Sequence, residues 1–190
     1  MISAILLAAG NSGRMGRPKA LLPYKKSIFI DHILKCLNTA GCSPVITVLG
    51  GHSALILENS SVSRHIYVIN KRPEDGMISS IKIGIKHLPL NAEGFLLALV
   101  DHPAVTQAVY DDIVKSASEN PEQIIIPQYK KRSGHPVYIG RTFFEQLLNA
   151  NADQTARDII HLNEEFITCL DIDDPGILKD IDYPEDFQKL

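Results

Sequence analysis

A glycine-rich loop with three cations follows the first apolar run of the chain. Glycines recur at every third position from Gly10 to Gly16, and Arg14, Arg17 and Lys19 lie between or just after them. Glycine lets the backbone turn tightly and offer its N–H groups to an anion, and the cations can neutralise phosphate charge. No glycine pair in this loop has G-x-G spacing, and no glycine precedes a lysine, which excludes a dinucleotide fingerprint and a Walker A loop. The pattern indicates a triphosphate-binding loop of another kind.

Aspartates at two other places have the chemistry of metal ligands. Asp101 ends the apolar run Phe95–Val100, and Pro103 closes the following turn. Ligands of open parallel sheets gather outside the carboxyl ends of strands, where a carboxylate can bind Mg²⁺ and bridge it to phosphates. Near the C-terminus, Asp180 and Asp182 share one face of an extended segment because their spacing is i, i+2. An aspartate at a strand end also caps helices, so both interpretations of Asp101 stay open at this level.

The hydrophobic pattern predicts the elements that position these residues. Stretches with helical spacing lie between most of the apolar runs, and this alternation predicts a doubly wound α/β fold with a mostly parallel sheet. From about residue 127 the alternation weakens, with a polar loop expected over 129–134. The expected strands are Ile2–Ala8, Val45–Leu49, Ile66–Ile69, Phe95–Val100, Ile124–Ile126 and Val137–Ile139, and the expected helices centre on Ile30–Leu37, Ile78–Leu88, Ile113–Ala117 and Thr142–Leu148.

Composition limits the class of protein. A chain of 190 residues suits one domain with its own hydrophobic core. Three cysteines without a C-x-x-C pair fit a reduced, cytoplasmic protein, which is the localisation we expect. The first apolar run has no basic leader and is too short to cross a bilayer. A formal net charge of −3 with scattered cations gives no footprint for nucleic acid, so we expect neither nucleic-acid nor membrane partners.

The segment from Leu7 to Lys19 reads L-A-A-G-x-S-x-R-M-G-x-x-K, which resembles the N-terminal signature of the nucleotidyltransferases. It is most similar to the molybdenum-cofactor cytidylyltransferase group. The resemblance implies a single Rossmann-like nucleotidyltransferase domain over residues 1–190, with a nucleotide-binding half of about 1–126 and an acceptor-binding half of about 127–190. It also implies Mg²⁺-dependent transfer of CMP from CTP to a phosphorylated acceptor, molybdopterin carrying molybdenum, with release of pyrophosphate.

The same resemblance assigns roles on the nucleotide side. It implies that Arg14 binds the β- and γ-phosphates, that Lys19 lies near the α-phosphate, and that Asp101 binds Mg²⁺ together with Asp182 or Asp180, of which Asp182 is favoured. Small side chains at positions 8 and 9 leave room for a base, and the Ala-Ala-Gly form accompanies pyrimidine nucleotides in the family. The expected nucleotide-binding residues are Leu7, Ala8, Ala9, Gly10, Gly13, Arg14, Met15, Gly16, Lys19, Ser79 and Ser80.

Two segments resemble the family's acceptor-binding motifs. Ser133-Gly134-His135-Pro136 is similar to its Gly-His-Pro segment, which implies that Gly134 and His135 contact the acceptor. Arg157 ends a segment similar to Gly-Asp-x-Gly-Ala-Arg and offers a forked donor for phosphate. A histidine before a strand is often structural, so that alternative stays open for His135.

Several positions depart from the family pattern. Val100 and His102 flank Asp101 where the family usually has Gly-Asp-Gln-Pro, and Ile78 replaces one serine of Gly-Met-Ser-Ser-Ser. Ala152 and Thr155 replace both glycines of the Gly-Asp-x-Gly-Ala-Arg segment. Because glycine permits close backbone approach, this last change bears on the acceptor and its pose.

Alternatives remain at this level. The same chemistry with GTP, or with a sugar or alcohol phosphate as acceptor, would use the same loop. A protein that binds the nucleotide or cofactor and delivers it to a molybdenum hydroxylase without turnover is a different class, and such a hydroxylase or its chaperone is an expected partner in either case. Ser79 and Ser80 fit helix capping as well as base recognition.

Overall fold

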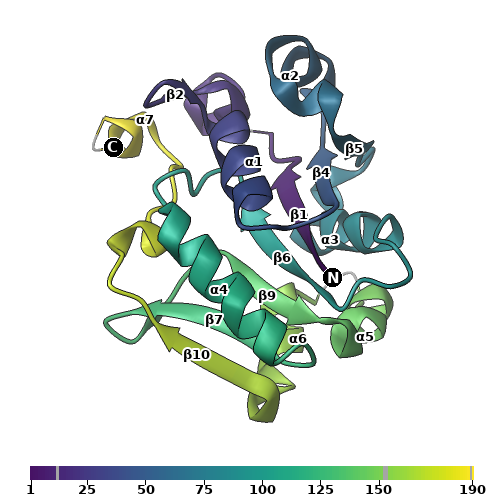
Figure 1. The fold of residues 1–190 in the computed structure, drawn as a ribbon. Coiled ribbons are helices and arrows are strands. Elements are labelled where there is room, and N and C mark those ends of the chain that lie inside the picture. The colour runs from purple at the N-terminus through teal and green to yellow at the C-terminus, as the bar shows by residue number, and fades with distance from the viewer. Residues whose placement is uncertain (12, 152–153, 189) are drawn as a thin grey trace.

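An eight-stranded sheet lies at the centre of the molecule in a computed structural model (Figure 1), which describes residues 1–11, 13–151, 154–188 and 190. The strands of the sheet are β1 (Ile2–Ala8), β4 (Val45–Leu49), β5 (Ile66–Ile69), β6 (Gly94–Leu99), β7 (Ile124–Tyr129), β8 (Arg132–Ser133), β9 (Val137–Gly140) and β10 (Ile167–Asp171), and β2 (Pro23–Tyr24) pairs separately with β3 (Ser27–Ile28). The helices are α1 (Phe29–Thr39), α2 (Ser53–Asn59), α3 (Met77–Lys86), α4 (Gln107–Glu119), α5 (Phe144–Asn149), α6 (Ala156–His161) and α7 (Pro184–Phe187).

The strand order β10-β7-β9-β6-β1-β4-β5 defines where the chain changes direction in the sheet. From β1 the chain moves through β4 to β5, and it then returns to place β6 on the other side of β1. Strand β9 runs antiparallel between β6 and β7, whereas the β1, β4, β5 and β6 pairs and the β7–β10 pair are parallel. The loops after β1 and β6 therefore diverge at a topological switch point, where α/β sheets bind ligands.

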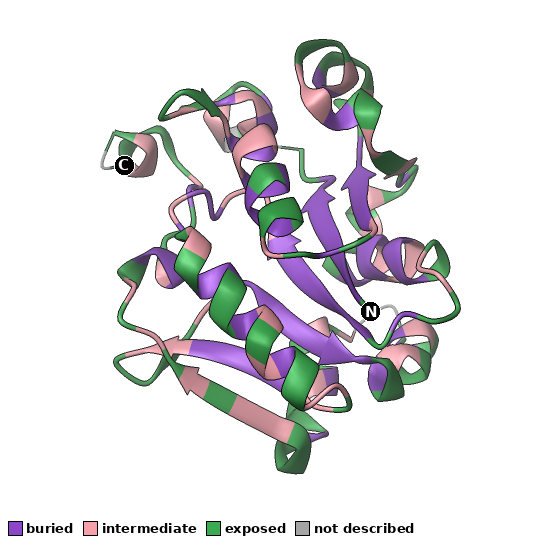
Figure 2. Cartoon of the chain, in the orientation of Figure 1, coloured by how far each residue is buried: buried purple, intermediate pink, exposed green. Residues whose placement is uncertain are grey.

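Helices cover both faces of the sheet, which explains why its central strands are mostly apolar, with Ser3 in β1 and Thr47 in β4 as buried exceptions. Alternate residues of β1 enter different cores: Ala4 and Leu6 pack with α1 and α4, whereas Ile5 and Leu7 pack with α3 and α5. Figure 2 shows the resulting pattern, with β1, β4 and β6 buried and the outward surface of α4 exposed. A strand buried on both faces reads as a continuous apolar run. These runs were the signal that predicted the strands.

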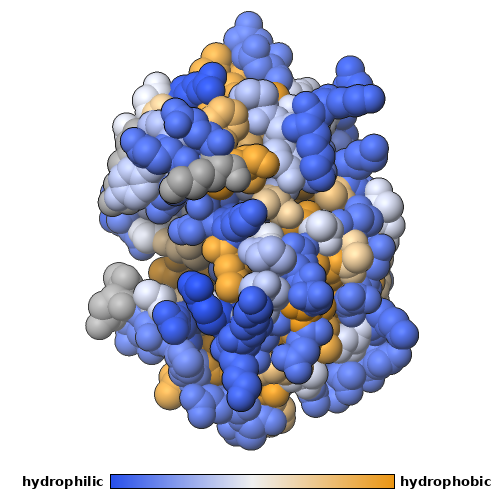
Figure 3. All heavy atoms as spheres, turned by 90° about the vertical axis from the view of Figure 1, so that its left-hand side faces the viewer, coloured by the Kyte–Doolittle hydropathy of each residue, from blue (hydrophilic) through white to orange (hydrophobic). Residues whose placement is uncertain are grey.

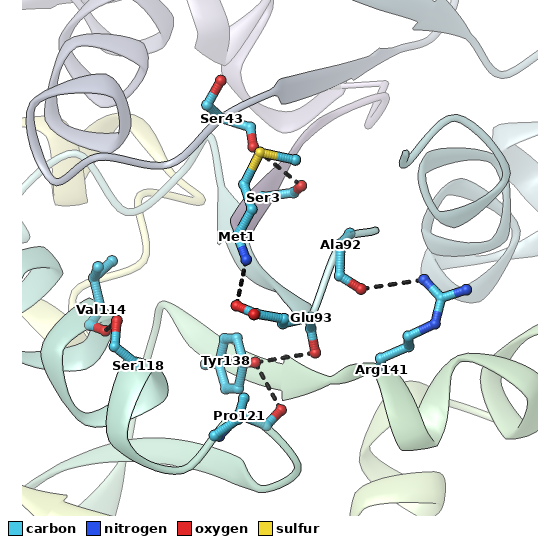
Figure 4. A network of polar contacts seen from close by, with 10 residues as sticks. All are labelled: Met1, Ser3, Ser43, Ala92, Glu93, Val114, Ser118, Pro121, Tyr138 and Arg141. Carbon is cyan, nitrogen blue, oxygen red and sulfur yellow. Dashed lines mark hydrogen bonds and ion pairs between the residues drawn. The ribbon is translucent and has the colours of Figure 1, made fainter. Parts of the chain in front are cut away.

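Buried polar contacts fix β9 against β6 at the amino end of β6 (Figure 4). The Tyr138 hydroxyl donates to the carbonyl oxygens of Glu93, at 3.2 Å, and Pro121, at 2.8 Å. Gly94 makes room for this ring, since a Cβ there would lie 2.2 Å from the Tyr138 hydroxyl oxygen. In this antiparallel pair Gly140 lies opposite Gly94 and Val137 lies opposite Leu97, so Gly134 and His135, just before β9, lie towards the carboxyl end of β6.

The predicted doubly wound, mostly parallel α/β fold is confirmed, with differences in its second half. The polar loop expected over 129–134 is a hairpin in which β7 continues to Tyr129 and pairs with β8. Its turn residues Lys130 and Lys131 have positive φ angles of 50° and 64°. The helix expected near 142–148 is a 3₁₀ turn followed by α5. Among the described residues, no helix has both the length and the apolar character that crossing a bilayer requires.

Candidate active site

The candidate active site lies at the switch point, where β1 and β6 end. The carboxyl ends of both strands point to the upper left in Figure 1. Figure 3 shows that side of the molecule, where hydrophobic atoms are visible in a hollow between its upper and lower parts. The main-chain N–H of Val100 donates to the Leu7 carbonyl at 3.0 Å, so pairing of the two strands continues up to the loops that carry the candidate residues. The fold thus brings together segments that are distant in the sequence.

The glycine loop is anchored by residues that follow the neighbouring strand β4. After a short 3₁₀ helix, Gly13–Met15, the chain turns at Gly16 with a φ of +67°, a conformation that favours glycine. The His52 ring donates a hydrogen bond to the Asn11 carbonyl at 3.1 Å. Gly50 passes against the start of the loop, and a Cβ at this position would lie 2.3 Å from the Ala9 carbonyl oxygen. Sequence reasoning missed Gly50 and His52, although a Gly-Gly pair at a strand end was a usable signal.

We expect Gly50→Ala to lower the melting temperature by several degrees, whereas Gly51→Ala should change it little. The added methyl at position 50 meets backbone atoms that cannot rotate away, and overpacking of this kind costs about 1–3 kcal/mol. At position 51 the nearest heavy atom would be 3.8 Å away, an ordinary contact. Thermal unfolding of both variants checks the expectation, at about 2–4 °C per kcal/mol for a chain of this size. Equal melting temperatures for the two variants would contradict it.

Lys19, Asp101 and Asp182 meet at the centre of the site. The Lys19 Nζ atom lies 3.4 Å from Asp101 Oδ2 and also forms an ion pair with Asp182 Oδ1. Only 14% of the Lys19 side chain is exposed, against 27% for Asp101 and 38% for Asp182. One ammonium group therefore joins two carboxylates that are more than 80 positions apart in the sequence.

A main-chain hydrogen bond brings the C-terminal acidic segment to the end of β6. The Ile181 N–H donates to the Asp101 carbonyl at 2.9 Å, and the Ile181 side chain is buried against Leu22 and Phe29. With Ile181 pointing inward, Asp182 reaches Lys19, whereas Asp180 is exposed. The structure thus joins Asp182, and not Asp180, to the Lys19 ion pair in the part of the chain that it describes.

The pair of carboxylates fits a divalent cation. The second carboxylate oxygen of Asp101, Oδ1, is buried and has no hydrogen-bond partner among the described residues. Mg²⁺ is usually bound through one or two carboxylates with phosphate and water completing the shell. No group of three or more His, Cys, Asp or Glu side chains that could hold a metal occurs within the described ranges. Asp101 and Asp182 therefore suit a metal ion whose other ligands come with a phosphorylated substrate.

A cavity of about 350 Å³ surrounds this ion pair. It contains seven of the residues expected to bind nucleotide, while Met15 packs instead beside Leu22 and Phe29. The side chain of Arg14 lies outside the described part of the structure. The described lining residues are Leu7, Ala8, Ala9, Gly10, Gly13, Pro18, Lys19, Ala20, His52, Ile56, Pro73, Gly76, Met77, Ser80, Leu99, Val100, Asp101 and Asp182.

The two serines of α3 are held by Asn70, a residue that sequence reasoning did not single out. The buried Asn70 side chain donates to Ser79 Oγ at 2.8 Å and to Ser80 Oγ at 2.9 Å, and its Oδ1 accepts from the Arg72 N–H. Gly76, not a serine, precedes α3 as its N-cap residue. These hydrogen bonds hold the start of α3 against the end of β5. Of the two serines, Ser80 lines the smaller cavity and Ser79 does not. A polar residue directly after an apolar strand was the available signal.

A second cavity of about 840 Å³ contains the residues expected to bind the acceptor. Gly134, His135 and Arg157 all line it, and it shares Gly76 and Met77 with the smaller cavity. The described lining residues are Asp75, Gly76, Met77, Ile78, Leu97, Ile126, Gln128, Ser133, Gly134, His135, Val137, Gln154, Thr155, Ala156, Arg157, Ile160, His161, Glu164, Ile167 and Cys169.

Local contacts explain how the residues expected to bind the acceptor are placed. A Cβ at Gly134 would lie 2.4 Å from the Ile177 carbonyl oxygen, so this glycine permits a close passage of two segments. Thr155 replaces a glycine of the family pattern and caps α6 through a reciprocal pair of bonds with Asp158. The exposed Arg157 donates from Nε to His161 Nε2 at 3.4 Å. Ala152 and Asp153 lie outside the described residues.

A buried histidine, His102, lies next to Asp101 and contacts His135, which lines the larger cavity. The rings of His102 and His135 meet edge to face with centroids 5.0 Å apart, and His102 Nε2 lies 3.9 Å from Asp101 Oδ1. Burial lowers the pKa of both rings: the charges of Asp101 and Asp180 oppose this effect at His102, whereas the proximity of His102 helps to bring the pKa of His135 to about 4. Both imidazole rings are therefore neutral at pH 7.

The low pKa of His135 predicts a loss of stability in mild acid. The unfolded state takes up this proton near pH 6.5, before the folded state does, so stability is complete above that pH and declines as pH falls towards 4. The free energy of unfolding is expected to fall by about 3 kcal/mol between pH 7 and pH 4. Urea unfolding at pH 7.5 and pH 5 should show a smaller difference for His135→Gln than for the wild type. The exposed His87→Gln is the control, and an unreduced pH dependence in His135→Gln would contradict the expectation.

Comparison with known proteins gives consistent matches. A family model described as a MobA-like NTP transferase domain matches residues 4–166. The chain is 26% identical to nicotine blue oxidoreductase of Paenarthrobacter nicotinovorans, across 100% of this chain and 96% of that protein. It is 25% identical to molybdenum cofactor cytidylyltransferase of Escherichia coli, across 98% and 93%. A probable molybdenum cofactor guanylyltransferase of Bacillus cereus is 29% identical across 65% of this chain and 60% of its own length.

Solved structures share the fold over the whole chain. The crystal structure of Rv0371c from Mycobacterium tuberculosis matches with a TM-score of 0.87 and 26% identity, covering 99% of this chain and 96% of that one. A complex of Rv0371C with manganese matches with a TM-score of 0.83 and 24% identity, covering 100% and 97%.

Proposed function

The chain belongs to the family of MobA-like NTP transferase domains, and from this premise we propose that it transfers CMP from CTP to molybdopterin carrying molybdenum and releases pyrophosphate. The observation that carries the proposal is the meeting of Lys19, Asp101 and Asp182 at the switch point, inside a cavity that adjoins a larger one. The Ala8-Ala9-Gly10 form of the loop, which resembles the pyrimidine type, and the likeness to a cytidylyltransferase support CTP.

The proposed reaction is a substitution at the α-phosphorus of CTP. An oxygen of the acceptor phosphate forms a bond to this phosphorus, and the bond from the phosphorus to the oxygen that bridges to the β-phosphate breaks. Pyrophosphate leaves with that electron pair. Lys19 neutralises the negative charge that develops at the α-phosphate, and backbone N–H groups between Gly10 and Gly16 hold the triphosphate, with Arg14 on its β- and γ-phosphates.

Asp101 and Asp182 hold Mg²⁺ in this proposal. When bound, the ion supplies Lewis-acid neutralisation of the phosphate oxygens. Support comes from the buried, unpartnered Oδ1 of Asp101 and from the shared ion pair with Lys19. Asp180 remains an alternative second ligand, since it lies close enough to His102 for its charge to raise that residue's pKa.

Residues of the second half recognise the acceptor. The larger cavity combines apolar walls with many polar and charged side chains, which suits a polar heterocycle with one phosphorylated end. Arg157 binds the acceptor phosphate, and Gly134 and His135 shape the wall nearest to Asp101. A molybdenum hydroxylase, or its chaperone, receives the product.

Thermal unfolding against CTP, GTP, UTP and ATP, each with and without Mg²⁺, tests the nucleotide. A ligand that binds only the folded state stabilises it by RT ln(1 + [L]/Kd), about 2.7 kcal/mol at a hundredfold excess over Kd. We expect a Mg²⁺-dependent increase in melting temperature with CTP that exceeds the increase with the other three. Cytidine, which lacks the phosphates, should give a much smaller one.

Other outcomes have defined meanings. A shift specific to GTP would favour guanylyl transfer, a possibility supported by the likeness to a guanylyltransferase. A CTP shift without pyrophosphate release in the presence of molybdenum-loaded molybdopterin would favour a delivery factor. No shift with any nucleotide would overturn the proposal.

A further inference from the structure

The ammonium group of Lys19 lies where the candidate metal ligands Asp101 and Asp182 would bind a cation. This group contacts Oδ2 of Asp101 and Oδ1 of Asp182 at the same time. We infer that Lys19 is the resident counter-ion of this carboxylate pair, and that it must move from the carboxylates to the triphosphate before they can bind a divalent cation. This inference rests on the proposed function and gives Lys19 a positioning role besides its proposed catalytic one.

Charge balance supports the inference. Two carboxylates joined by one ammonium carry a net charge of about −1, and a divalent cation placed beside Lys19 would meet a like charge a few Å away. The triphosphate removes this conflict, since its negative charges attract both the ammonium and the metal ion. Occupation of the site by metal should therefore be weak without nucleotide and strong with it. By linkage, the metal must raise nucleotide affinity by the same factor.

The local structure allows the Lys19 side chain to move while its backbone stays fixed. The 3₁₀ helix Lys19–Leu21 follows Pro18, and the buried Ala20 within it and Leu22 just after it anchor its backbone. The Leu22 N–H donates to the Lys19 carbonyl at 3.0 Å. Only the flexible four-carbon stem needs to rotate, and it does so inside the smaller cavity that it lines.

The carboxylates, in contrast, are held in place. Asp101 lies two residues after the end of β6, and its carbonyl accepts the hydrogen bond from Ile181 that fixes the segment carrying Asp182. Asp101 Oδ1 is already buried without a hydrogen-bond partner among the described residues. Since no third acidic, His or Cys ligand joins them within the described ranges, the described residues offer a divalent cation these two carboxylates beside the Lys19 ammonium.

Binding of Mn²⁺ alone to the nucleotide-free protein, followed by electron paramagnetic resonance, tests the inference. Lys19→Met retains the apolar stem and removes the charge, so we expect it to bind Mn²⁺ at least about tenfold more tightly than the wild type, a difference of about 1.4 kcal/mol. Lys19→Arg retains the charge and should resemble the wild type. Lys26→Met, an exposed lysine outside the site, is the matched control. Adding Asp182→Asn to Lys19→Met should abolish the gain.

The outcomes separate this inference from the proposed function. Equal Mn²⁺ affinity of the wild type and folded Lys19→Met, judged by their melting curves, would overturn the counter-ion role. If Lys19→Met does not fold, Lys19→Gln supplies the same comparison. If Mn²⁺ strengthens the binding of CTP to the wild type, that observation would still support the proposed function after such a result. A wild type that binds CTP equally with and without Mn²⁺ would overturn the inference and the proposed metal site together.

Discussion

Replacing Lys19 with methionine is expected to lower the turnover number by about 100- to 1,000-fold, the usual effect of removing one group that stabilises developing charge. The ammonium lies at the switch point inside the smaller cavity, and the methionine retains only its apolar stem. Because the loss concerns charge that grows during the reaction, the turnover number should fall far more than the affinity for CTP. Pyrophosphate release at saturating CTP and acceptor measures the effect.

The control for this substitution is Lys26→Met, which changes an exposed lysine outside both cavities. It should retain the wild-type rate. Circular dichroism and melting curves establish that Lys19→Met is folded. An unchanged turnover number in the folded variant would remove Lys19 from the mechanism.

Asp101→Asn is expected to weaken the metal dependence of the reaction strongly. The amide has nearly the same shape as the carboxylate but carries no charge, so of the two described carboxylates that contact Lys19 only Asp182 would remain to balance both Lys19 and the metal ion. We expect the Mg²⁺ concentration for half-maximal rate to rise by about tenfold or more, since 1.4 kcal/mol of lost interaction corresponds to tenfold. Titration of the rate with Mg²⁺ at fixed CTP gives this quantity.

Asp112→Asn is the matched control, because Asp112 lies exposed on α4 and lines neither cavity. Its Mg²⁺ titration should coincide with that of the wild type. A titration of Asp101→Asn that coincides as well would exclude Asp101 as a metal ligand and leave it as a partner of Lys19 only.

Strands that carry an apolar run were predictable from the sequence, including β5 at one edge of the sheet, whereas β10 at the other edge was not. The apolar runs at 2–8 and 45–49 became β1 and β4 with unchanged bounds, because helices on both faces favour apolar residues at nearly every position, with Ser3 and Thr47 as buried polar exceptions. Strand β10 lies at the sheet edge, with residues that are intermediate or exposed, so its sequence has no such run. The hairpin of β7 and β8 was expected as a loop because Lys130 and Lys131 occupy positions where turns usually have glycine or asparagine.

The candidate site was predictable where a motif lies next to a strand. Lys19 and Asp101 follow the first and fourth predicted strands, and both line the smaller cavity. The contact of Asp182 with Lys19 depends on the Ile181 hydrogen bond, a tertiary feature that no local pattern specifies. Asn70 was missed because its role, holding two serines of another segment, is visible only when β5 and α3 are placed together. The roles assigned to all these residues stay predictions.

The two cavities draw their described walls from largely separate stretches of chain and share only Gly76 and Met77 among them. Substitutions over 126–169 alter the larger cavity and leave the glycine loop and its cations untouched. This separation favours evolutionary divergence, since a descendant protein can change its acceptor specificity while its nucleotide-binding residues stay the same. Gly76 and Met77 line both cavities, so a substitution there that suits one substrate must also leave binding of the other intact. These two residues should therefore constrain how freely the two specificities evolve.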